Sequence, residues 1–89
     1  MVRIDRIEKS PIAGKKYRAY LSDGRKVDFG ASGYEHFKDK VGMYSSLDHH
    51  DPERRRKYRA RHGKIKLKDG RIAKDVKYTP AWFSWHYLW

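Results

Sequence analysis

The chain has 89 residues, with 22 lysines and arginines against 11 aspartates and glutamates, and it contains no cysteine. Its formal net charge is +11, and only 38% of its residues are hydrophobic. This length allows one domain, 1–89, with a small core, and the lack of cysteine excludes disulfides and cysteine-ligated zinc. We expect no membrane span and no secretory signal, because no apolar run approaches roughly 20 residues and the first ten residues lack an apolar region.

The first part of the chain, 1–30, is predicted to be a β-hairpin region. Runs at 2–8, 16–21 and 26–30 mix apolar, aromatic and polar residues in a pattern that favours strands. Asp23-Gly24 lies between the last two runs and is a strong hairpin signal, because both central residues of such a turn take a positive φ. We therefore expect a small antiparallel sheet.

A short helix is predicted after the sheet, over 34–41. Tyr34, Phe37 and Val41 have helical spacing, and Gly42 is placed to end the helix.

The clearest helix signal lies at 51–63. Asp51 suits the N-cap, Pro52 suits the first turn, and Gly63 suits the position after the last turn. Basic side chains surround this helix and oppose one another at i, i+4, so we expect counter-charges from a partner. The candidate residues for binding an anionic surface are Arg54, Arg55, Arg56, Lys57, Arg59 and Arg61.

The remainder divides into a basic arm over 64–78 and an aromatic helix over 79–89. The arm is predicted to be extended or to form a second small hairpin at Asp69-Gly70. Thr79 is the predicted cap of the last helix, whose aromatic face either packs on the chain's own sheet or inserts into a neighbouring subunit. The candidate anchors for such a partner are Trp82, Phe83, Trp85 and Trp89.

Motifs for catalysis and metal binding are missing. There is no phosphate-binding glycine loop and no HExxH. The His-His-Asp run at 49–51 has metal-ligating residue types, but neighbouring histidine side chains diverge on most backbones. We therefore expect no catalytic residue, no metal site, no cofactor and no small-molecule substrate. The basic surface favours backbone contacts to nucleic acid without sequence preference, or contacts to protein.

Three blocks of the sequence together resemble a family of proteins: VDFGASGYEHF (27–37), HDPERRRKYRARHG (50–63) and PAWFSWHYLW (80–89). They are similar to small basic capsid-associated, minor-capsid-like proteins of large double-stranded DNA viruses of algae and amoebae, with relatives in phages. The resemblance implies a virion component that is made in the host cytoplasm or nucleus, has capsid proteins as partners and has no catalytic residues.

The sequence thus predicts an α+β protein with an N-terminal antiparallel sheet, a central basic helix and a C-terminal aromatic helix. The hypothesis for function is a non-enzymatic minor capsid or cement subunit in the virion. The alternative is a sequence-nonspecific nucleic-acid-binding protein packaged with the viral genome.

Overall fold

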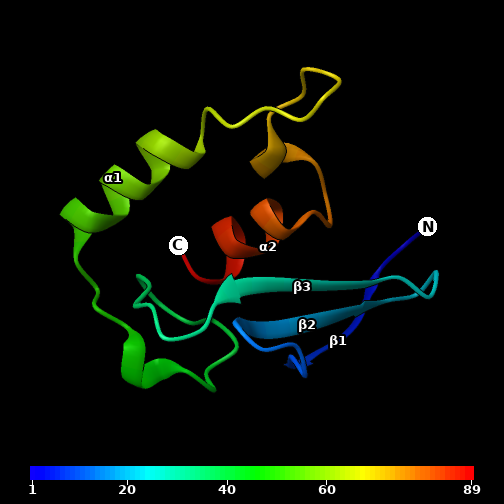
Figure 1. The fold of residues 1–89 in the computed structure, drawn as a ribbon, viewed down its shortest axis with the longest axis horizontal. Helices are drawn as coiled ribbons and strands as arrows, with labels where there is room; N and C mark the ends of the chain where they lie inside the picture. Colours follow the sequence, from blue (N-terminus) through cyan, green and yellow to red (C-terminus); the bar gives the residue numbers. More distant parts are fainter.

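The computed structural model describes residues 1–89 and consists of a three-stranded antiparallel sheet followed by two α-helices (Figure 1). The sheet has the order β1-β2-β3, with antiparallel pairing throughout. The small α+β fold that the sequence predicts is confirmed. The strands are β1 Ile4–Lys9, β2 Lys15–Leu21 and β3 Lys26–Ala31; the helices are α1 Pro52–His62 and α2 Pro80–Tyr87; the 3-10 turns are η1 Ser45–Leu47 and η2 Ala73–Asp75.

The predicted turn between β2 and β3 is present but differs from the expected type. Gly24 has φ 91°, whereas Asp23 does not take a positive φ. Instead, the Asp23 carboxylate accepts a hydrogen bond from the backbone N–H of Arg25 at 3.0 Å. An aspartate side chain that bonds two residues ahead mimics a backbone turn, so only the glycine needs left-handed geometry.

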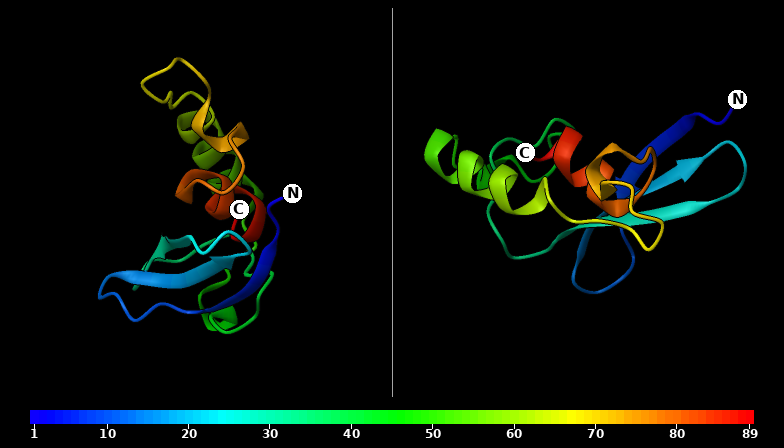
Figure 2. Two further views of the ribbon diagram at one scale, coloured as in Figure 1. Left: turned by 90° about the vertical axis from the view of Figure 1, so that its right-hand side faces the viewer. Right: turned by 90° about the horizontal axis from the view of Figure 1, so that it is seen from above.

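The core lies between one face of the sheet and α2, which forms a second layer (Figure 2). Phe83 of α2 stacks on Phe29 of β3 with ring centroids 4.9 Å apart. The Thr79 side chain caps α2 by accepting from the backbone N–H of Trp82 at 3.2 Å. The buried core residues are Tyr17, Ala19, Leu21, Phe29, Phe83 and Leu88.

The prediction of a helix over 34–41 is wrong, since this segment forms an irregular loop. Its backbone groups bond to distant segments instead of to the next turn. The N–H of His36 donates to Leu47 O, and the N–H groups of Lys38 and Lys40 donate to Leu88 O and Tyr87 O at 3.0 and 2.9 Å. These long-range bonds satisfy the backbone, so the helical spacing of the apolar residues is overridden.

Helix α1 and the segment that follows it agree with the sequence in outline. The Asp51 carboxylate accepts from the backbone N–H of Glu53 at 2.9 Å, as expected for an N-cap. Gly63 follows the last turn of the helix, as expected, with φ −66° in right-handed geometry, so no left-handed conformation calls for glycine here. The glycine is required for a different reason: a Cβ there would lie 2.6 Å from the carbonyl oxygen of Arg59. The segment 64–78 contains the small hairpin, bridged between Lys66 and Ile72.

Candidate anion-binding site

The basic helix and the aromatic helix, which the sequence singled out separately, contact each other. Tyr58 of α1 lies between two rings: His62, with centroids 4.0 Å apart, and Trp89, with centroids 4.1 Å apart and ring planes 3° apart. Trp85 lies at 6.2 Å from the same tyrosine. Burial in this stack raises the pKa of Tyr58 to about 12. We call these four residues, Tyr58, His62, Trp85 and Trp89, the aromatic clamp.

Two of the arginines predicted to bind anions instead attach α1 to the C-terminal residues of the clamp. The Arg55 Nε donates to the main-chain oxygen of Trp89 at 2.8 Å, and its guanidinium lies 4.6 Å from the ring centroid of Phe37. Arg59 donates to the same oxygen at 3.2 Å and lies 4.9 Å from the Trp85 ring. Cation–π contacts of this kind contribute roughly 0.5–2 kcal/mol each. Arg55 and Arg59 are therefore structural, which explains how a helix that fully buries no residue is retained.

The predicted partner anchors lie against their own chain. Phe83 has no exposed surface, so its prediction as an anchor is wrong: the ring fills the core beside Phe29. Trp85 and Trp89 are partly buried in the clamp. Trp82 is also partly buried and packs edge-on against Phe83 at 5.1 Å.

Three of the remaining basic residues of α1 form a stripe along its exposed side. Arg54, Lys57 and Arg61 are spaced i, i+3, i+7, which places them on one side of a helix. Arg54 pairs with Glu35 at 2.8 Å, with both side chains about half exposed. Lys57 and Arg61 make no ion pair or side-chain hydrogen bond. We call these three residues the basic stripe.

Arg56, the last of the six predicted residues, lies off this stripe and pairs with Glu53 one turn earlier. The structure thus separates the six predicted residues into two that hold α1, three that form the stripe and one that is paired locally.

An open cleft of about 480 Å³ lies beside the basic stripe, between α1, α2 and the ends of β2 and β3. Arg61 and His62 line its α1 side, and Ala81 and Ser84 line its α2 side. No local sequence pattern indicates this cleft, because the segments that form it are far apart along the chain. Its charged lining is four cationic side chains and one carboxylate: Lys15, Lys16, Arg54, Arg61 and Glu35.

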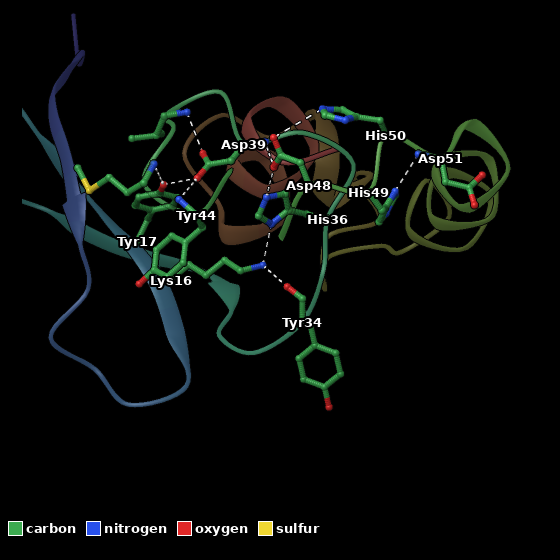
Figure 3. Close-up of polar contacts among 12 residues, drawn as sticks. Lys16, Tyr17, Tyr34, His36, Asp39, Tyr44, Asp48, His49, His50 and Asp51 are labelled. Carbon is green, nitrogen blue, oxygen red and sulfur yellow. Dashed lines mark hydrogen bonds and ion pairs between the residues drawn. The ribbon is translucent and has the colours of Figure 1, made fainter. Parts of the chain in front are cut away.

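Behind the cleft, Lys16 begins a buried chain of polar contacts (Figure 3). Its ammonium lies 2.7 Å from the carbonyl oxygen of Tyr34 and 2.9 Å from His36 Nδ1, and His36 Nε2 lies 2.5 Å from Asp48. An ammonium only donates and a carboxylate accepts, so His36 is neutral with its proton on Nε2. Burial lowers the pKa of both Lys16 and His36, and the Lys16 charge lowers that of His36 further.

A second carboxylate organises the loop that covers this chain of contacts. Asp39 accepts hydrogen bonds from the Tyr17 hydroxyl and from the backbone N–H groups of Val41 and Tyr44, the latter two at 2.8 Å. Burial raises the pKa of Asp39, but these hydrogen bonds lower it by more, so the pKa lies below its usual value. Asp39 and His36 therefore fix 34–48 over the end of the sheet, which the sequence reading missed entirely.

The His-His-Asp run does not assemble a site. His49 Nδ1 accepts from the backbone N–H of Asp51 at 2.9 Å, and His50 Nε2 lies 3.7 Å from Asp48. No group of three histidine, aspartate or glutamate side chains is arranged to hold a metal ion. Neither α1 nor α2 combines the length and apolarity needed to cross a bilayer.

Comparison with protein families identifies the class to which the chain belongs. The model of the family described as "Family of unknown function (DUF5754)" matches residues 6–62. The chain belongs to this family. The matched region contains most of β1, all of β2 and β3, the buried contacts of Lys16 and the basic stripe, and it ends before α2. No curated protein and no solved structure matches the chain.

Proposed function

We propose that this protein is a non-enzymatic binding protein whose basic stripe contacts the phosphates of nucleic acid without sequence preference. The observation that carries this proposal is the exposed row of Arg54, Lys57 and Arg61, in which two of the three side chains have no counter-ion within the chain. The aromatic clamp holds the neighbouring side of α1, through Tyr58 and His62, and leaves the basic stripe exposed.

The dimensions of the stripe suit a phosphate backbone. Seven residues along a helix span about 10 Å, and each DNA strand carries one phosphate per roughly 3.4 Å of axis. A stripe that lies along one strand therefore reaches about three phosphates. The pair between Arg54 and Glu35 is exposed and contributes only about 0–1 kcal/mol, so a phosphate can replace the glutamate.

The test compares two charge-matched double variants in a fluorescence anisotropy titration of duplex DNA. K57Q/R61Q removes one lysine and one arginine from the stripe. R3Q/K26Q makes the same charge change near the opposite end of the molecule, by the N-terminus and the β2–β3 turn (Figure 1). We expect K57Q/R61Q to make the slope of log affinity against log salt concentration shallower by about 1.8, since each lost phosphate contact removes about 0.9. Equal effects of both variants, or no binding at low salt, would overturn the proposal.

A second candidate is a minor capsid or cement subunit of a virus particle, located in the virion. It is favoured by the resemblance of the three sequence blocks to capsid-associated proteins and by the partial exposure of Trp82 and Trp85, which leaves apolar surface for a neighbouring subunit. In this version the basic stripe pairs with an acidic capsid face. The two candidates separate in shells emptied of DNA: a capsid partner retains the protein there, whereas a nucleic-acid partner does not.

A further inference from the structure

The cleft beside the basic stripe has the size of a small-ligand site and owes its space to small residues. Its volume of about 480 Å³ falls in the range of roughly 300–1,000 Å³ typical of such sites. Gly30 and Ala31 of β3 and Ala81 and Ser84 of α2 line it. Gly30 has φ 79°, and a Cβ there would lie 2.9 Å from Leu88 Cδ1, so the close approach of β3 and α2 at this point requires glycine.

Positive charge enters the cleft from two sides. Arg61 comes from α1 and Lys15 from β2, and neither has an ion-pair partner. Lys16 lies in the wall with only 2% of its surface exposed, and two of its three ammonium protons are already used. The only acidic side chain in the lining is that of Glu35, which is bound to Arg54. The lining of the cleft therefore offers an anionic ligand a guanidinium and an ammonium without ion-pair partners, the donors that suit a phosphate.

Aromatic side chains also line the cleft. Tyr34 lines the cleft with 71% of its surface exposed, and no ring of the chain stacks on it. His62 stacks on Tyr58 through one face only. Burial lowers the pKa of His62, which keeps its ring neutral near pH 7. Free aromatic faces beside unpaired cations are the combination that binds the bases and phosphates of single strands.

We propose that this cleft binds one phosphorylated nucleoside unit, either a free nucleotide or the phosphorylated end of a single strand. The phosphate lies between Arg61 and Lys15, and the base stacks on Tyr34 or His62. This inference rests on the proposed function in that Arg61 belongs both to the basic stripe and to the cleft. It extends that function from duplex backbone to a single nucleotide.

The test fills the cleft without changing its charge. A81W places a large ring on the α2 wall, and A60W places the same ring on an exposed position of α1 that does not line the cleft. The probes are adenosine monophosphate, adenosine, inorganic phosphate, and a single strand with or without a 5′ phosphate, followed by NMR titration. If A81W fails to fold, A31W at the end of β3 replaces it.

We expect adenosine monophosphate to shift the resonances of Arg61, Lys15 and Tyr34, and to bind about tenfold or more tightly than adenosine or phosphate alone, because stacking and charge act together. A81W weakens this binding by a similar factor, whereas A60W leaves it unchanged. Equal binding of nucleotide and strand end identifies the single unit as the ligand. Preference for the phosphorylated strand identifies strand ends. Absence of shifts in the cleft, or equal losses in A81W and A60W, would overturn the proposal.

The same samples separate the two proposals. Duplex affinity depends on Lys57 and is unaffected by A81W, whereas nucleotide affinity depends on the cleft. Nucleotide binding without duplex binding would support the assignment of the cleft and refute the role of the basic stripe. Duplex binding without nucleotide binding would do the reverse.

Discussion

Replacing Tyr58 by alanine tests how α1 is held. The Tyr58 ring makes two stacked contacts, with His62 and Trp89 at 4.0 and 4.1 Å. Each aromatic pair contributes about 0.5–1.5 kcal/mol, so the change removes about 2 kcal/mol from the docking of α1. A released helix of 11 residues is marginal in water and is further opposed by its own like charges. We therefore expect α1 to open locally while the sheet remains folded.

Amide hydrogen exchange measures this opening directly. The Gly63 N–H is bonded to the Arg59 carbonyl oxygen at 2.9 Å, and it reports on α1. We expect its exchange to accelerate about 30-fold, which corresponds to about 2 kcal/mol at 1.4 kcal/mol per factor of ten. Amides in β2, such as that of Ala19, should not change. Y34A, which removes an exposed tyrosine, is the control. Equal exchange of α1 in Y58A and the wild type would refute the role of the clamp.

Three further predictions concern a helix cap, a close contact at a glycine and a buried histidine. D51A removes the N-cap of α1 and should lower the free energy of unfolding by about 1 kcal/mol in urea denaturation, without altering the sheet. G30A should lower the free energy of unfolding more than G33A does. Both glycines have positive φ, but a Cβ at Gly30 would meet Leu88, whereas nothing lies within 4 Å of a Cβ at Gly33. Equal decreases in the free energy of unfolding would contradict this. Burial, and then a nearby ammonium, lower the pKa of His36 in the folded state, so the unfolded chain binds the proton more readily and stability should fall as the pH drops below about 6.5. H36Q should show a smaller fall between pH 7 and pH 5 than the wild type, and an unchanged slope would show that His36 does not cause it.

Local signals in the sequence were sufficient for most of the fold. Asp51 and Thr79 each precede a proline, and the side chain of each caps a helix in the structure. The Asp23-Gly24 pair correctly placed the β2–β3 turn. These signals work because caps and tight turns depend on neighbours within a few residues.

The errors arise where distant segments determine the outcome. The apolar spacing at 34–41 is helical, yet its backbone bonds to 47 and to 87–88, which no local pattern encodes. The burial of Phe83 instead of the neighbouring tryptophans follows from its stacking on Phe29, and large indole rings are seldom fully buried.

The candidate site was only partly predictable for the same reason. Charge alone marked Arg54, Lys57 and Arg61. It could not distinguish them from Arg55 and Arg59, which contact Trp89 and Trp85 of the clamp. The cleft needs Lys15 and Arg61 from opposite parts of the chain. Neither feature has a local signature, so both depend on the tertiary structure.

The salt dependence of duplex DNA binding by the unmodified protein tests the central proposal most directly. The three side chains of the basic stripe should give a log–log slope of about −2.7 between roughly 50 and 200 mM salt, at about 0.9 per phosphate contact. A slope near this value, reduced in K57Q/R61Q, is the expected result. Affinity that does not change with salt, or the absence of affinity at about 50 mM salt, would contradict the assignment of the stripe to phosphate binding.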